Sequence, residues 1–291
     1  MKHCWMFPTI PPAYAIGGRN GDLIQLLPCW KAIHDRIRRK PVVICSQEYA
    51  SVFDGVSYVE PHPINAHWWK GLPAMKALAE QLYGGGIVAQ FWQEPPRSDD
   101  TIGAKGKTWT TLQSHGHEHG VDMSLDPDYG TSMARRCGFS RSEWLKLPLV
   151  FDRRNREREE LLARQVFKAD HRPVLLYNFA GVSSPFGYWP EVSNALMRTS
   201  NGHFNLVDLG KVRGHRIFDV LGLIDRAVGF ITCDTYSLHL ALGGKTPYVA
   251  FTVDGWTSSV PKGNCVLHVK YNSTKPRLHE VMAVVESWKA K

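Results

Sequence analysis

Short apolar runs alternate with segments of helical periodicity along most of this chain. Such runs are typical of buried strands in a parallel sheet, and the periodic segments are typical of the helices that connect them. Over the first half, the pattern predicts strands at 3–7, 13–16, 42–45, 56–59 and 87–91. It predicts helices at 22–39, 47–53, 72–82 and 130–137.

The alternation restarts after Pro148. Strands are predicted at 174–179, 204–209, 228–233 and 248–252. Helices are predicted at 155–168, 190–199, 215–226, 236–242 and 276–289. Two such series predict an α/β protein with two Rossmann-like domains, residues 1–150 and 151–291, that face each other across a cleft. Ligands in such folds bind beyond the carboxyl ends of the strands, so chemistry is expected there.

Residues 93–128 lack any clear period and are rich in Gly, His, Ser, Thr and Asp. A stretch of this length without periodicity is usually a functional loop or insertion. It contains His115, His117 and His119, which alternate and would share one side of an extended segment. Three imidazoles can bind zinc, but an exposed polar loop or an acceptor-binding loop is the better interpretation of these loop-like surroundings.

Composition indicates an ordinary soluble protein, with 43% hydrophobic and 21% charged residues. No apolar run approaches the ~20 residues that cross a bilayer, and three prolines interrupt the first twelve residues, unlike a signal peptide. We therefore expect a cytoplasmic protein without stable membrane insertion, and leave peripheral association with the inner membrane open. The six cysteines form no CxxC pair, so Cys45 and Cys233, inside predicted strands, are interpreted as small core residues. The net charge of +8 favours an anionic partner.

Three segments that follow predicted strands could carry chemistry. The first is the glycine-rich turn from Gly17 to Asp22, in which a substrate could approach the backbone closely and Asp22 could cap the next helix. The second runs from Asn178 to Ser184, where Ser183 and Ser184 could hold phosphate oxygens before a helix. The third ends a strand at Asp234-Thr235 and begins a helix that carries His239. Each segment also has a purely structural interpretation, as a helix cap or an ordinary loop.

In their order and spacing, these segments resemble glycosyltransferase family 9, the lipopolysaccharide heptosyltransferases. Gly21-Asp22, followed by an apolar run and Pro28, matches the amino-terminal signature of the family. The chain also resembles the family at residues 55–59 and 209–211. Residues 234–239 are similar to the Asp-Thr-Gly-x-x-His motif of the family, and residues 244–247 are similar to its Gly-Lys-Pro motif. The resemblance covers most of the chain apart from 93–128.

The resemblance implies a GT-B fold and direct transfer, with inversion, of a sugar from a nucleotide-diphosphate donor to an acceptor hydroxyl. The nucleotide sugar is a co-substrate, and neither a cofactor nor a metal is expected. Asp22 would be the general base, and the turn around it would lie on the acceptor side (Gly18, Arg19, Asn20 and Gly21). Donor-binding residues would be Ser183, Ser184, Asp234, Thr235, His239 and Lys211. The acceptor would be a lipopolysaccharide-type glycan.

Two positions depart from the family pattern. Gly187 stands where the family usually has a cation that touches the donor phosphates, and Tyr236 stands where it has a glycine. Arg19, Lys211 and Arg213 could supply the missing charge. The departures keep two alternatives open: a phage-type glycosyltransferase acting on hydroxylated DNA bases, and a non-catalytic binding protein on the same fold. The basic balance and ten tryptophans, among them Trp68, Trp69, Trp92 and Trp109, would suit DNA.

Overall fold

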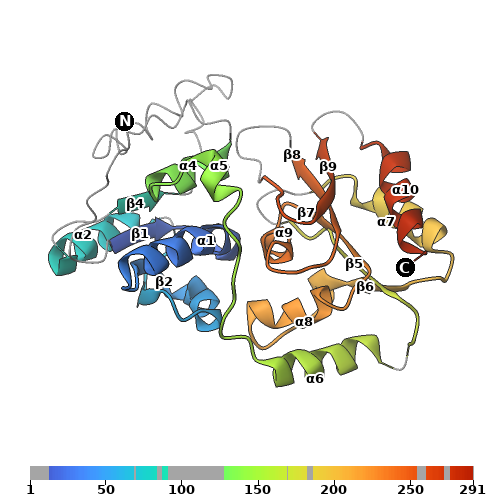
Figure 1. Cartoon of the computed structure of the whole chain (residues 1–291), viewed down its shortest axis with the longest axis horizontal. Coiled ribbons are helices and arrows are strands. Elements are labelled where there is room, and N and C mark those ends of the chain that lie inside the picture. Colours follow the sequence, from blue (N-terminus) through green and yellow to red (C-terminus); the bar gives the residue numbers. More distant parts are fainter. Residues whose placement is uncertain are drawn as a thin grey trace. The chain divides into compact units, whose positions relative to one another are not determined.

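A computed structural model of the chain describes residues 13–68, 70–83, 87–90, 128–168, 170–181, 186–253, 260–271 and 276–290. The chain divides into two compact units, Met1–Arg153 and Arg154–Lys291, with the elements labelled in Figure 1. Among the described residues, each unit contains one sheet, and the strand pairings are parallel. The predicted α/β fold with parallel sheets is therefore confirmed.

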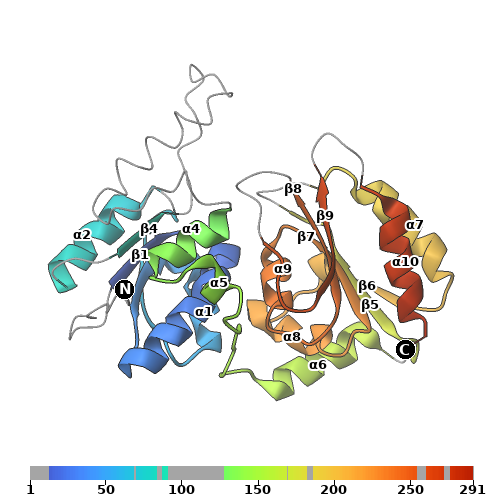
Figure 2. The ribbon, with the colours of Figure 1, turned by 45° about the horizontal axis from the view of Figure 1, so that its top comes forward.

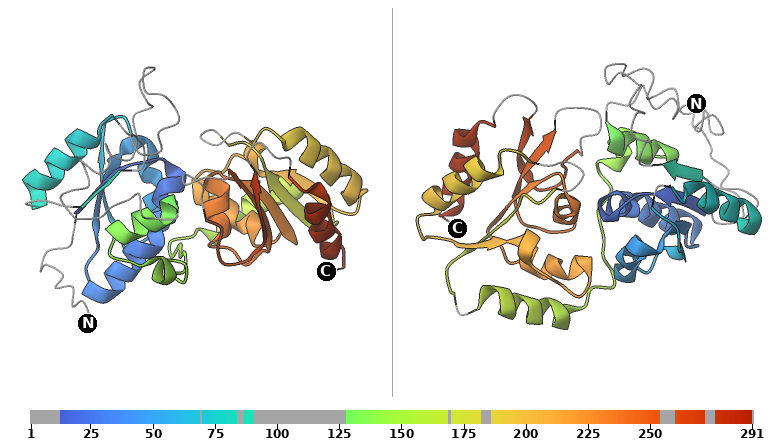
Figure 3. Two further views of the ribbon diagram at one scale, coloured as in Figure 1. Left: turned by 90° about the horizontal axis from the view of Figure 1, so that it is seen from above. Right: turned by 180° about the vertical axis from the view of Figure 1, so that it is seen from behind.

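The sheet of the first unit has the strand order β3-β2-β1-β4. Its strands are β1 (Ala13–Gly17), β2 (Val42–Ser46), β3 (Glu60–Ile64) and β4 (Ile87–Gln90). Alternate residues of β1 face opposite layers. Ala13 and Ala15 pack with Met75 of α2 (Leu72–Tyr83), and Tyr14 contacts Trp30 of α1 (Asn20–Ile37). Helices therefore cover both faces of this sheet, as Figure 3 shows.

The strand predicted at 56–59 is wrong, because the strand begins at Glu60. Val56 and Val59 are buried in the preceding loop, which explains the apolar run. Strand β3 escaped prediction because it contains Pro61 and Pro63. Both prolines are tolerated because β3 is an edge strand, where alternate N–H groups need no partner. Three further helical elements complete the described part of this unit: η1 (Gln47–Gly55), α4 (Tyr129–Arg136) and α5 (Arg141–Trp144).

The sheet of the second unit has the order β6-β5-β7-β8-β9. Its strands are β5 (Val174–Asn178), β6 (Asn205–Asp208), β7 (Gly229–Cys233), β8 (Tyr248–Val253) and β9 (Cys265–Tyr271). Helices α7 (Trp189–Ser200) and α10 (Leu278–Trp288) lie together on one face (Figure 2). The other helical elements are α6 (Arg156–Phe167), η4 (Leu209–Lys211), η5 (Ile217–Val220), α8 (Leu221–Ile224) and α9 (Tyr236–Ala241).

Two predictions for this unit need correction. The helix predicted at 215–226 is shorter than expected, because its residues form the 3-10 turn η5 followed directly by the single turn of α8. Strand β9 was not predicted. It is an edge strand with mostly alternating exposure, and His268 and Lys270 interrupt its apolar run.

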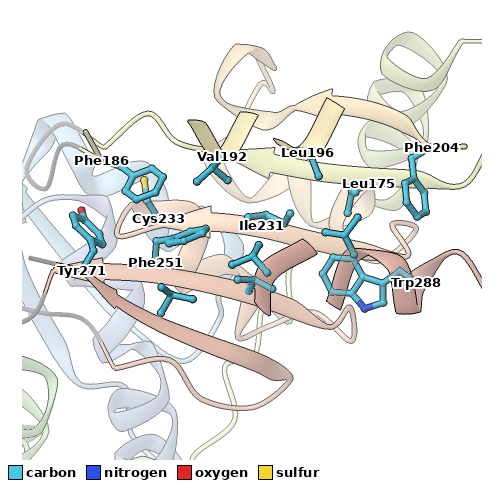
Figure 4. Close-up of a cluster of buried hydrophobic side chains, with 14 residues drawn as sticks. Leu175, Phe186, Val192, Leu196, Phe204, Ile231, Cys233, Phe251, Tyr271 and Trp288 are labelled. Carbon is cyan, nitrogen blue, oxygen red and sulfur yellow. The ribbon is translucent and has the colours of Figure 1, made fainter. Parts of the chain in front are cut away.

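A large apolar cluster lies between the sheet of the second unit and helices α7 and α10 (Figure 4). Leu175 and Ile231 contribute from the central strands, and Trp288 closes the end near the amino end of β7. At the opposite end the ring of Phe186 lies 4.7 Å from that of Phe251 and 5.0 Å from that of Tyr271. These rings fill the carboxyl end of the sheet on this face.

Cys45 and Cys233 are buried in their strands, as predicted. Burial raises the pKa of each thiol to about 12, so both remain protonated at neutral pH. Across the described residues, no helix has both the length and the apolar character needed to cross a bilayer.

Candidate functional site

Three loops converge at the carboxyl edge of the first sheet. They follow β1, β2 and β3. The Ser46 hydroxyl, at the end of β2, donates to the carbonyl oxygen of Ala66 at 2.8 Å and so ties the second loop to the third. A Cβ at Gly17 would lie 3.1 Å from the carbonyl oxygen of Trp68, so a glycine there lets the third loop approach β1 closely. This edge flanks the switch point between β1 and β4, where such folds bind ligands.

Asp22 stands in the first turn of α1, directly after β1. Its Oδ2 accepts the backbone N–H of Arg19 at 2.7 Å, which is the reach-back half of a capping box. The carboxylate is half-buried. Asp22 therefore has a structural role in starting the helix, and the same hydrogen bond holds its carboxylate at the sheet edge.

Arg19 and Trp68 form a stacked pair beside Asp22. The guanidinium carbon of Arg19 lies 4.6 Å from the centre of the Trp68 ring. Trp68 is only 6% exposed and Arg19 is half-buried. Asn20 is half-buried too, and its side-chain oxygen is buried without a hydrogen-bond partner in the described part of the chain. Since Trp68 is buried beneath Arg19, it cannot stack on a nucleic-acid base.

Tyr49, which the sequence did not indicate, lies near the same groups. Its pKa is raised to about 12, first by burial and then by its hydrogen bond to Glu48. Asp22 raises the pKa of Tyr49 further and Arg19 lowers it, so both charges act on this hydroxyl. At neutral pH Tyr49 is a neutral donor next to a carboxylate and a guanidinium. Only the position of Tyr49, just after β2, could have indicated it.

At the second sheet, polar side chains end three adjacent strands. Asn178 ends β5, Asp208 ends β6, and Asp234 follows β7. The switch point of this sheet lies between β5 and β7, so the expected ligand position falls among these residues. A Cβ at Gly210 would lie 3.0 Å from Oδ1 of Asn178 and 3.2 Å from Oδ1 of Asp208. The glycine therefore lets the loop after β6 pack closely against the neighbouring strand end.

A hydroxyl network joins β5, β7 and α9 beneath this edge. The Ser237 Oγ lies 2.8 Å from Oγ1 of Thr232 and 2.7 Å from Oγ1 of Thr235, and it accepts from Nδ2 of Asn178 at 3.0 Å. Thr232 donates to the carbonyl oxygen of Cys233 at 3.1 Å. One assignment satisfies every group: Thr235 donates to Ser237, and Ser237 donates to Thr232. The network fixes the loop that carries Asp234.

Thr235 also caps α9, since its Oγ1 accepts the N–H of Ser237 at 3.1 Å. The helix is only six residues long, so its dipole is small. Asp234 is half-buried and acts on two histidines. Burial lowers the pKa of His239. The charge of Asp234 acts to raise this pKa, and that of Lys262 acts to lower it further. Burial also lowers the pKa of His268, which hydrogen-bonds Thr252 at 2.7 Å.

Two cations accompany Tyr236 at this edge. Lys211 is exposed, with its Nζ 3.5 Å from Oδ2 of Asp208. Arg213 donates to the carbonyl oxygen of Gly210 at 2.8 Å. Burial raises the pKa of Tyr236, Arg213 lowers it and Asp208 raises it, so this phenol lies close to both charges. Gly187 is open, because a Cβ there would meet nothing within 4 Å.

The structure thus brings the predicted residues together in two groups. Gly18 to Asp22 lie between the end of β1 and the first turn of α1, and Asp234, Thr235 and His239 lie with Lys211 near the ends of β6 and β7. Ser183, Ser184 and His115–His119 lie outside the described residues, as do Trp69, Trp92 and Trp109. Asn178, Asp208 and Ser237 were not predicted as site residues, although Asp208 lies near the end of a predicted strand and Asp234 directly follows one. Among the described residues, no three His, Cys, Asp or Glu side chains form a group that could hold a metal ion.

No protein-family model and no curated protein sequence matches the chain. Solved structures do match. The family 9 glycosyl transferase of Veillonella parvula DSM 2008 aligns over 96% of this chain and 96% of its own, at a TM-score of 0.58 and 9% identity. The ADP-heptose LPS heptosyltransferase II of E. coli aligns over 96% of this chain and 98% of its own, at a TM-score of 0.62 and 12% identity. The E. coli heptosyltransferase WaaC with ADP aligns over 94% of this chain and 96% of its own, at a TM-score of 0.51 and 11% identity. None of these findings supports modified DNA as an acceptor. The chain shares the GT-B fold of the family 9 glycosyltransferases, as its motifs led us to expect.

Proposed function

We propose that the chain is a glycosyltransferase that moves a sugar from a nucleoside-diphosphate donor to an acceptor hydroxyl, with inversion. The observation that carries the proposal is the position of Asp22. Its carboxylate is held at the carboxyl edge of the first sheet, beside the switch point, within a fold shared with glycosyltransferases of known structure. A binding protein would not need a carboxylate there, since a neutral amide side chain at this position could also accept the N–H of Arg19.

In the proposed reaction, the Asp22 carboxylate takes the proton of the acceptor hydroxyl. The oxygen attacks the anomeric carbon of the donor, and the bond from that carbon to the diphosphate breaks. The nucleoside diphosphate leaves with the electron pair, and the protonated Asp22 releases its proton to water. Attack from the side opposite the leaving group inverts the anomeric centre, and the step requires no metal ion.

We assign the donor to the second unit. Asp234 would accept from the ribose hydroxyls, and the loops held by Asn178 and Thr235 would present backbone N–H groups to the diphosphate. Lys211 and Arg213 would supply positive charge at the position where Gly187 lacks it. Ser183, Ser184 and His239 complete the predicted set. ADP-heptose is the first donor to test, since ADP and ADP-heptose appear with the structurally similar enzymes. A lipopolysaccharide-type glycan is the proposed acceptor, and action in the cytoplasm belongs to the same proposal.

The test is release of nucleoside diphosphate from ADP-heptose and other nucleotide sugars by wild-type protein, Asp22→Asn and Asp22→Ala. Asparagine can still accept the N–H of Arg19, so Asp22→Asn keeps the helix cap and removes only the base. We expect Asp22→Asn to lose turnover while it keeps wild-type stability and nucleotide binding. Asp22→Ala should lose turnover and also about 1 kcal/mol of stability. Full turnover by Asp22→Asn would exclude Asp22 as the base.

A further inference from the structure

A pocket of about 230 Å³ lies in the second unit, between α6 and the loop that follows η4. Helix residues at positions i, i+3, i+4 and i+7 share one face. That face of α6 lines one side of the pocket with Arg158, Leu161, Leu162 and Gln165. The other side consists of Arg213, Gly214, His215 and Asp219.

The positive charge around this pocket is not compensated. Arg158 and Arg213 are exposed, and neither forms an ion pair with a carboxylate of the described residues. The carboxylate in the pocket wall belongs to Asp219, and Arg216 engages both of its oxygens. The side chain of Arg216 donates to Oδ1 at 2.9 and 2.7 Å, and its backbone N–H donates to Oδ2 at 2.9 Å. In this respect the pocket differs from the rest of the unit, where seven described arginines form ion pairs: Arg154, Arg156, Arg164, Arg172, Arg216, Arg226 and Arg277.

The pocket also has an apolar side. Leu161 is 52% exposed, and Leu162 is buried beside it in the pocket wall. A ligand that covers the exposed leucine would remove apolar surface from water, which favours binding. Arg213 donates to the carbonyl oxygen of Gly210 at 2.8 Å. This hydrogen bond restrains the guanidinium without neutralising it, so less conformational entropy is lost when an anion binds. A compact anionic group attached to an apolar one would satisfy both sides.

We infer that this pocket binds a small phosphate monoester. The dianion matches the two guanidinium charges, and its three terminal oxygens can accept from Arg158, Arg213 and a ring N–H of His215. A carboxylate carries one charge and two oxygens, so it would leave part of the positive charge unmatched. The pocket is smaller than the roughly 300 Å³ at which pockets for drug-sized ligands begin, so a nucleotide is too large for it. The inference does not depend on the proposed glycosyl transfer.

The test is calorimetric titration with phenyl phosphate, inorganic phosphate and ADP. We expect the wild-type protein to bind phenyl phosphate about ten-fold more tightly than inorganic phosphate, because the ring covers Leu161. Leu161→Ala should reduce this preference to about three-fold. Arg213 also belongs to the proposed donor site, so Arg158 is the residue to replace. Arg158→Gln should weaken the binding of phenyl phosphate by about five-fold or more, and should leave the binding of ADP unchanged.

Arg198→Gln is the matched control. Arg198 is exposed and, like Arg158, forms no ion pair with the described residues, but it belongs to α7 and does not line the pocket. The control removes the same charge and should bind phenyl phosphate as the wild type does. Vesicles with and without phosphatidic acid then distinguish the source of the phosphate. Cosedimentation that requires Arg158 would identify a lipid phosphate, and no cosedimentation would identify a free monoester.

Three results would overturn the inference. The first is no binding of phenyl phosphate to the wild-type protein at millimolar concentration. The second is equal weakening in Arg158→Gln and Arg198→Gln, since the effect would then come from the overall charge of the protein. The third is a joint loss of phenyl phosphate and ADP binding in Arg158→Gln, which would assign Arg158 to the donor site instead.

Discussion

Ser237 joins the strand ends that frame the proposed donor site, and replacing it by alanine should weaken the second unit. The substitution removes the acceptor of the Asn178 amide, whose Nδ2 lies 3.0 Å from the Ser237 oxygen. Asn178 and Thr232 are both 0% exposed, so water cannot replace the lost partner. Thr235 is half-buried, so its hydroxyl can turn to another partner.

The magnitude follows from these exposures. One buried donor left without a partner costs about 1–3 kcal/mol. The lost hydrogen bond to Thr232 lowers the stability by up to about 1 kcal/mol more. We expect Ser237→Ala to lower the free energy of unfolding by about 2 kcal/mol, and to lower the melting temperature of the second unit by several degrees.

The assay is urea denaturation followed by circular dichroism, compared with thermal melting. Ser287→Ala is the matched control, because the exposed Ser287 hydroxyl also donates one hydrogen bond, to the carbonyl oxygen of Val284 at 2.6 Å. Its effect should stay within about 0.5 kcal/mol. If Ser237→Ala were as stable as Ser287→Ala, the network would not hold this edge together, and our account of it would be refuted.

Three further predictions concern the second unit. Burial lowers the pKa of His239, so this side chain binds a proton more readily in the unfolded chain than in the folded one. The free energy of unfolding should therefore fall as pH drops from 7.5 to 5.5. In melting experiments, His239→Gln should flatten this pH dependence. An equally steep pH dependence in the variant would exclude His239 as its source. Gly229→Ala places a Cβ 2.2 Å from Cε3 of buried Trp288, so it should cost at least 1–3 kcal/mol by denaturation; wild-type stability would contradict the packing. A Cβ at Gly187 would meet nothing within 4 Å, so Gly187→Arg should fold normally and bind nucleoside diphosphates several-fold more tightly by calorimetry, whereas unchanged affinity would place the diphosphate elsewhere.

Elements with a strong local signal could be predicted from the sequence. Helix α1 has a clear apolar face, and β2, β5, β7 and β8 are short apolar runs. The two strands that were missed, β3 and β9, are edge strands. Strand β3 contains two prolines, and three of the seven residues of β9 are exposed. An edge strand buries less apolar area than a central strand, so its sequence shows less of the continuous apolar pattern.

Site residues divide in the same way. Asp22 and Asp234 could be proposed from the sequence, since Asp22 follows the glycine-rich turn after an apolar run and Asp234 comes directly after an apolar run and before a helix. Trp68 and Tyr49 could not, because what matters is their distance from Arg19 and Asp22, and the chain separates them by whole elements. Only the parallel order of β1, β2 and β3 brings their loops to one edge. Ser237 looks like an ordinary helix residue in the sequence, and its three partners come from two strands and a cap.

The central claim is that the second unit binds a nucleoside diphosphate as the leaving group of a sugar donor. The most direct test is the thermal stability of the wild-type protein with ADP, UDP and GDP, and with CMP as a monophosphate comparison. Our account predicts that one diphosphate, at a hundred times its dissociation constant, raises the free energy of unfolding by about 2.7 kcal/mol. The sugar conjugate of the same nucleotide should do so as well. An unchanged melting temperature with every nucleotide at millimolar concentration would contradict the account.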